Sequence, residues 1–191
     1  MGITYNAPFV LTYALVAVSV IAYNTFVDPT VIPFYFTLQP YYSYEDPLFY
    51  FRLFSYAVGH GSWEHLIDNF IYLLLIGPYL EEKYGSQSVF SMALFTAVIT
   101  SLLYLGFLVV APNAQPSSIV GSSGIVFMMI LLGSFTNVRS GHIPLTFIFI
   151  MLFFMGTQVI NAFDDNQISE FAHIVGGICG SFFGFVKNKK S

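Results

Sequence analysis

The chain has 191 residues, of which 56% are hydrophobic and only 8% are charged, and its formal net charge is −4. Soluble domains carry about 25% charged residues, so this composition excludes an ordinary soluble protein and indicates an integral membrane protein. Nucleic acid is also excluded as a partner, because the sequence has no basic cluster suited to binding phosphates. The single cysteine, Cys179, excludes an internal disulfide.

Six apolar runs follow one another along the chain, each near the roughly 20 residues with which an α-helix spans a bilayer. The second run is short unless it also takes in the polar stretch from His60. We therefore predict an all-α, polytopic membrane protein with six transmembrane helices in a single domain, residues 1–191. The runs are Phe9–Val27, Leu66–Leu80, Val89–Ala111, Ile119–Phe135, Ile143–Phe163 and Ile168–Val186.

The basic residues predict the orientation, because Lys and Arg are enriched on the cytoplasmic side of a membrane. With six spans, the basic residues fall on the side of both termini, except for Arg52. We expect both termini to be cytoplasmic. The first outer loop, residues 28–59, is long and aromatic, and its rings, Phe49 and Tyr56 among them, are expected in the headgroup layer.

Polar residues of three runs are predicted to lie at one depth. Gly121-Ser122-Ser123-Gly124 opens the main apolar stretch of the fourth run, and its small residues would let a backbone or a substrate approach Ser123. At about 1.5 Å per residue, Ser123 lies about 6 Å into its run, and His65 and His173 lie about 7–8 Å into theirs. Polar side chains at membrane depth need a reason. Their agreement indicates one water-accessible cavity that opens outward.

The residue types in this layer point to nucleophilic catalysis. A serine hydroxyl is a weak nucleophile until a base removes its proton, and histidine is the usual base. No Asp or Glu is expected at this depth on the fourth or sixth run, which favours a Ser-His dyad over a triad. His65 and Asn69 share a helix face and can stabilise an oxyanion together with the N–H of Ser123. A polar clamp between helices explains His65 and Asn69 equally well when they are taken singly.

The pattern resembles the rhomboid family of intramembrane serine proteases over nearly the whole chain. Phe51-Arg52 stands where that family usually has Trp-Arg, and Glu81-Glu82-Lys83-Tyr84-Gly85 looks like its turn after the second helix. The remaining matching elements are Gly121-x-Ser123-Gly124, Ala172-His173 followed by Gly176 and Gly180, and His60-x4-His65-x3-Asn69.

The resemblance implies a six-helix bundle in which Ser123 is the nucleophile and His173 is the general base. It also implies an oxyanion hole formed by His65, Asn69 and the amide of Ser123. The expected activity is hydrolysis, without a cofactor, of a peptide bond in or near the transmembrane segment of single-pass membrane proteins. The active site would open to the extracytoplasmic side of the lipid bilayer.

Supporting roles are implied for His60, Gly121 and Phe127. The family often has Tyr at the position of Phe127, under the ring of the catalytic histidine, and Phe can still stack there. The spacing of Gly176 and Gly180 would let the sixth helix approach the fourth closely.

Three other functions stay open. The chain could be a catalytically inactive rhomboid-like protein that binds membrane helices. A metal site could be formed by His60, Glu64, His65 and Asp68, although we expect no metal, and the role of Asp68 is not assigned. A small transporter is disfavoured, because paired discontinuous helices and an internal repeat are not apparent.

Overall fold

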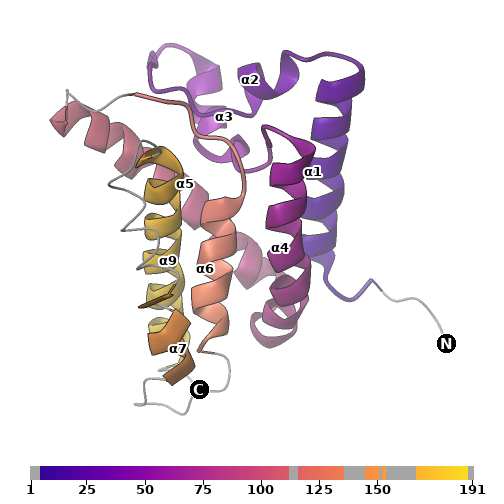
Figure 1. The fold of residues 1–191 in the computed structure, drawn as a ribbon, viewed down its shortest axis with the longest axis vertical. Helices are drawn as coiled ribbons and strands as arrows, with labels where there is room; N and C mark the ends of the chain where they lie inside the picture. Colours follow the sequence, from indigo (N-terminus) through magenta and orange to yellow (C-terminus); the bar gives the residue numbers. More distant parts are fainter. Residues whose placement is uncertain (1–4, 112–115, 136–144, 151, 154–166, 189–191) are drawn as a thin grey trace.

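The computed structural model describes residues 5–111, 116–135, 145–150, 152–153 and 167–188. This part is built from α-helices, with one isolated antiparallel bridge between Leu38 and Ile119 (Figure 1). The prediction of an all-α protein is confirmed. The helices are α1 (Pro8–Phe26), α2 (Val31–Tyr35), α3 (Pro47–Ser55), α4 (Trp63–Tyr84), α5 (Ser86–Val110), α6 (Ser123–Gly133), α7 (Leu145–Ile150) and α9 (Gln167–Asn188).

The helices differ in their capacity to cross a membrane. Among the described residues, α1 and α5 are long and apolar enough to span by length and composition. Helices α4 and α9 have 22 residues each, or about 33 Å at 1.5 Å per residue, but both carry charged residues. Helix α6 has only 11 residues, and most of the fifth run, after α7, lies outside the described residues. The count of six spans and the single domain stay predictions.

Helix α4 reaches its length by adding residues at both ends of the predicted run Leu66–Leu80, part of the polar stretch before it included. It begins at Trp63, because Ser62 is its N-cap and the Ser62 hydroxyl accepts a hydrogen bond from the N–H of His65 at 3.1 Å. The helix then continues through its charged last turn to Tyr84. The expected extension of this helix back to His60 is wrong, and His60 lies in the preceding loop.

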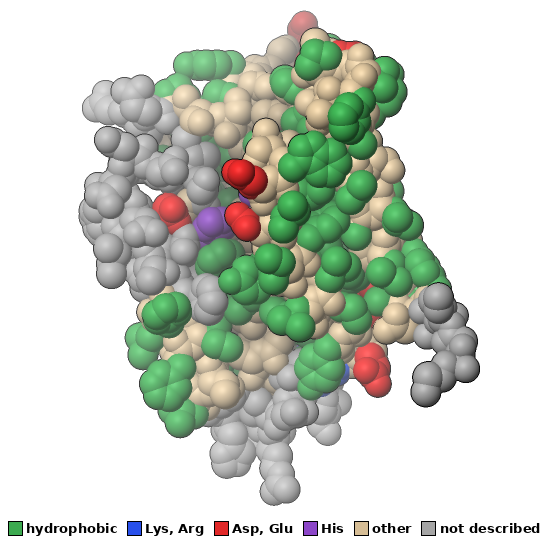
Figure 2. Space-filling view, turned by 45° about the vertical axis from the view of Figure 1, so that its right-hand side comes forward, with side chains coloured by type: hydrophobic (Ala, Val, Ile, Leu, Met, Phe, Trp, Pro, Cys, Tyr) green, Lys and Arg blue, Asp and Glu red, His purple; other side chains and the backbone are tan. Residues whose placement is uncertain are grey.

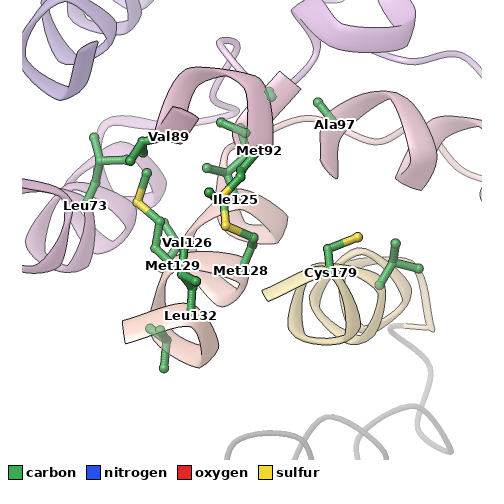
Figure 3. Close-up of a cluster of buried hydrophobic side chains, with 14 of the residues drawn as sticks. Leu73, Val89, Met92, Ala97, Ile125, Val126, Met128, Met129, Leu132 and Cys179 are labelled. Carbon is green, nitrogen blue, oxygen red and sulfur yellow. The ribbon is translucent and has the colours of Figure 1, made fainter. Parts of the chain in front are cut away.

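Helix α6 lies at the centre of the bundle, between α4, α5 and α9 (Figure 3). The backbone of α6 packs directly against the backbone of α9. A Cβ atom added to Gly176 would overlap the carbonyl group of Gly124, and one added to Gly180 would overlap that of Met128. The expected close approach of these two helices through Gly176 and Gly180 is confirmed.

The long loop between α1 and α4 contains α2 and α3, and Arg52 connects distant parts of this loop to one another. The Arg52 guanidinium donates to the carbonyl of Phe34 at 2.7 Å and pairs with Asp46 at 3.2 Å. Two of its aromatic residues are not at the surface: Phe49 is 7% exposed and Tyr56 is 3% exposed. The expectation that these two rings face the headgroup layer is wrong, because they pack into the hydrophobic core.

Glu81 connects the last turn of α4 to the first turn of α1. Its carboxylate is buried and accepts hydrogen bonds from the backbone N–H groups of Phe9, at 3.1 Å, and Val10, at 2.7 Å. The first N–H groups of a helix have no partner inside the helix, and they favour negative charge. Glu81 therefore caps a helix that is distant in sequence.

Replacing Glu81 by alanine is expected to lower the free energy of unfolding by about 2 kcal/mol, because one buried and one partly buried N–H group lose their acceptor. Thermal unfolding of the purified protein in detergent micelles measures this change. The matched control is Glu82→Ala, since Glu82 is the exposed neighbour and its removal is expected to leave the unfolding temperature nearly unchanged. Equal shifts for the two variants would contradict the capping role.

Candidate active site

Helices α4, α6 and α9 all begin at the same end of the bundle, and there they line a cavity of about 460 Å³. This volume holds several water molecules at about 30 Å³ each. The cavity reaches the surface, because Asp68 and Ser118 in its lining are exposed. Histidine and acidic side chains gather at one place on an otherwise largely uncharged face in Figure 2. The lining residues are His65, Asp68, Asn69, Tyr72, Ser118, Ile119, Val120, Ser123, Val126, Phe127, Ile130, Ala172 and His173.

Ser123 is the first residue of α6, and the described residues that lead up to it, 116–122, are not helical. Ile119 exchanges two backbone hydrogen bonds with Leu38, at 2.9 and 3.0 Å. The hydroxyl of Tyr104 donates to the carbonyl of Ser117 at 2.6 Å and accepts from its N–H at 3.1 Å. The expected start of this helix at Ile119 is wrong, because these contacts keep the chain out of the helical conformation. Ser123 is thereby left at the helix N-terminus, where backbone N–H groups have no acceptor in the helix.

Gly121 brings the backbone next to His65. Its φ angle is +119°, in a region that favours glycine. A Cβ atom at this position would lie 2.5 Å from Cε1 and 2.8 Å from Nε2 of His65. The N–H of Gly121 donates to the carbonyl of Tyr56 at 3.0 Å, which fixes the turn. Any side chain at position 121 would displace either this turn or the His65 ring.

His60 fastens the loop before α4 to the turn before α6. The residue is 1% exposed, its ring atom Nδ1 lies 3.1 Å from the carbonyl of Val58, and its Nε2 lies 3.1 Å from the hydroxyl of the buried Ser122. A carbonyl oxygen only accepts, so Nδ1 donates to Val58, and the neutral ring then accepts the Ser122 proton at Nε2. His60 therefore positions the residue that directly precedes Ser123.

The metal site considered from the sequence finds no support in this geometry. Both ring nitrogens of His60 are engaged as described, and Glu64 and Asp68 are exposed. Within the part of the chain that the structure describes, no group of three or more His, Cys, Asp or Glu residues could hold a metal ion.

His65 and Asn69 both line the cavity, as expected from their shared face on α4. The amide nitrogen of Asn69 donates to the carbonyl of His65 at 2.8 Å, and the residue is 6% exposed. An amide carries two N–H donors, so this bond uses only one of them.

His173 lies in the second turn of α9 and lines the same cavity as Ser123. Its ring stacks on that of Phe127, with centroids 4.3 Å apart and planes inclined by 8°. The expectation that Phe127 stacks on this histidine is confirmed. Because Phe127 is four residues after Ser123, one turn of α6 carries both the serine and the surface against which the histidine rests.

A carboxylate lies beside His173. Oε2 of Glu170 is 3.5 Å from Nδ1 of His173, and the side chains of the two residues are 10% and 16% exposed. The expectation of no Asp or Glu beside the predicted catalytic layer on the sixth run is wrong, because Glu170, which the predicted run Ile168–Val186 already contained, lies on α9 one turn before His173 and contacts its ring. Residues three apart share a helix face, and this spacing was the signal that could have revealed the pair.

Residues 48–190 match the family model described as the Rhomboid domain, which covers well over half of the sequence. The chain belongs to the rhomboid family. Given its apolar helices as well, this rhomboid is an integral membrane protein.

Two curated relatives are similar to this rhomboid. Rhomboid-related protein 1 of Caenorhabditis elegans is 30% identical over 145 residues, which cover 71% of this chain and 39% of the relative. Rhomboid-like protein 11, chloroplastic, of Arabidopsis thaliana is 24% identical over 147 residues, which cover 77% of this chain and 48% of the relative. The matched region thus spans less than half the length of either relative.

Proposed function

We propose that this rhomboid is an intramembrane serine endopeptidase that hydrolyses a peptide bond in or near the transmembrane segment of single-pass membrane proteins. The observation that supports this most is that Ser123 and His173, on different helices, line one cavity that reaches the surface. A buried polar pair that only joined two helices would not need such a cavity beside it.

In the proposed reaction, Oγ of Ser123 attacks the scissile carbonyl carbon while Nε2 of His173 takes the hydroxyl proton. His173 then gives this proton to the leaving amine, and a water molecule from the cavity hydrolyses the acyl-enzyme by the same route. The stack on Phe127 supports this role, because it fixes the plane of the imidazole ring.

The negative charge that develops on the substrate oxygen needs hydrogen-bond donors that are already in place. We assign this task to the N–H of Ser123, the ring of His65 and the second amide N–H of Asn69. All three residues line the cavity, and the contact with Gly121 holds the ring of His65 beside the turn that carries Ser123.

The membrane setting of the proposal has both termini in the cytoplasm and the active site open to the extracytoplasmic side. Helix α1 begins and α9 ends at the lower end of the bundle in Figure 1, whereas the cavity lies where α4, α6 and α9 begin, at the upper end. The distribution of Lys and Arg supports the same orientation. A substrate helix would reach the cavity from the lipid bilayer.

Labelling with a fluorophosphonate tests the proposal, because this reagent reacts with activated serine hydroxyls. We expect mass spectrometry of the labelled, purified protein to find the adduct on Ser123. Labelling should disappear in Ser123→Ala, fall strongly in His173→Ala, and stay unchanged in Ser91→Ala, which replaces an exposed serine of α5. Folded protein that captures membrane helices but shows no adduct on Ser123 would favour the inactive rhomboid-like alternative.

A further inference from the structure

Glu170 is a buried carboxylate whose position the proposed reaction does not yet explain. The residue is 7% exposed, and within the described residues its Oε2 atom is buried without a hydrogen-bond partner. Burying a carboxylate without partners is unfavourable, so such a group needs a structural or functional reason. The nearby polar group that the structure gives it is Nδ1 of His173, at 3.5 Å.

We infer that Glu170 is a positioning residue that orients the imidazole of His173 towards Ser123, and this inference rests on the proposed peptidase function. A carboxylate facing Nδ1 selects the tautomer with its proton on Nδ1, which leaves Nε2 free of a proton to accept the one from Ser123. Phe127 fixes the plane of the ring, and Glu170 fixes its rotation within that plane.

The separation of 3.5 Å is somewhat longer than the roughly 2.7–3.2 Å of an N–H···O hydrogen bond. Catalytic hydrogen bonds are often long without substrate and shorten in the complex with it. The spacing of the two residues on one helix keeps their backbones at a fixed distance, so a small rotation of either side chain closes the bond.

The contact between Glu170 and His173 also has a role during the proposed reaction. When Nε2 takes the proton of Ser123, the ring becomes positively charged, and the carboxylate of Glu170 stabilises this charge while itself staying ionised. Among the described residues, the other ionisable groups on the cavity all lie on α4 and are His65, Asp68 and Tyr72. Asp68 is exposed, so water screens its effect on His173 more than that of the buried Glu170.

The test compares Glu170→Ala and Glu170→Gln with the unchanged protein, using cleavage of a transmembrane peptide substrate in micelles. We expect Glu170→Ala to lower kcat about tenfold to a hundredfold, less than the roughly 10⁴-fold known for the buried Asp of serine-protease triads. KM should change less than about twofold, because Glu170 is not in the lining of the cavity. Glu170→Gln retains an acceptor oxygen, and it is expected to recover part of the lost kcat.

The matched control is Glu64→Gln, which removes an exposed acid from α4 and is expected to leave kcat unchanged. Thermal unfolding and the rate of fluorophosphonate labelling are measured on every variant. A purely structural role predicts that activity falls only in proportion to the folded fraction, and that result overturns the inference. Because Gln has nearly the volume of Glu, Glu170→Gln serves if Glu170→Ala does not fold.

The experiments distinguish a failure of the positioning role of Glu170 from a failure of the peptidase proposal. If Ser123→Ala abolishes cleavage while both Glu170 variants keep the kcat of the unchanged protein, only the positioning role of Glu170 is wrong. If Ser123→Ala cleaves like the unchanged protein, the peptidase proposal itself is wrong, and the positioning role falls with it.

Discussion

Replacing Ser123 or His173 by alanine is expected to lower the rate of substrate cleavage by about 10⁴-fold or more. The first change removes the nucleophile, and the second removes the base without which the serine hydroxyl is unreactive. Because the two side chains act as a unit, the double variant should be no less active than either single one. Neither change should unfold the protein, since both residues face a cavity rather than a filled core.

The measurement uses purified protein in micelles with a generic single-pass membrane substrate, and the products are separated on a gel. The control Ser91→Ala should cleave at the rate of the unchanged protein, and thermal unfolding should show all variants folded. Cleavage by either alanine variant at the rate of the unchanged protein would remove the catalytic assignment.

Hydrophobicity alone was sufficient to predict the helices that consist almost entirely of apolar residues. The runs Phe9–Val27 and Val89–Ala111 agree closely with α1 and α5. Such segments are apolar on all sides, so their helical structure depends little on any particular partner.

The start of α6 could not be predicted in this way, because a distant contact determines it. The apolar run begins at Ile119, yet Leu38 pairs with this residue through two backbone hydrogen bonds, which keep it out of the helix. A pairing between positions so far apart leaves no local pattern in the sequence. The helix starts from which we counted the depths of Ser123 and His65 were therefore wrong, and the depths themselves stay predictions.

The polar residues that line the cavity could nevertheless be predicted from the sequence. Ser123, His65, Asn69 and His173 all line it, because each follows closely on the beginning of its helix, wherever that beginning lies. Glu170 was missed although the predicted run Ile168–Val186 contains it, because its charge suggested contact with water, whereas the side chain is buried beside His173 in α9.

The contact between α6 and α9 leads to the second large effect that we expect. A methyl group at Gly176 would have to occupy the space of the Gly124 carbonyl, and backbone atoms cannot move aside as a flexible side chain can. Gly176→Ala should therefore lower the free energy of unfolding by about 3 kcal/mol, at the upper end of the usual range for overpacking. Thermal unfolding in micelles measures this loss.

The loss of activity should be larger than the loss of folded protein alone would cause, because His173 lies one turn before Gly176 on the same helix. If α9 moves outward by the width of a methyl group, the imidazole moves away from Ser123, and a misplacement of about 1 Å can lower a rate about 10²-fold. Gly106→Ala is the matched control: a Cβ atom there meets nothing within 4 Å, and alanine favours a helix over glycine by about 0.5–1 kcal/mol. The two substitutions should thus change stability in opposite directions. If Gly176→Ala matched Gly106→Ala in stability and cleaved at the normal rate, the close approach of α6 and α9 would not be what holds His173 at the cavity.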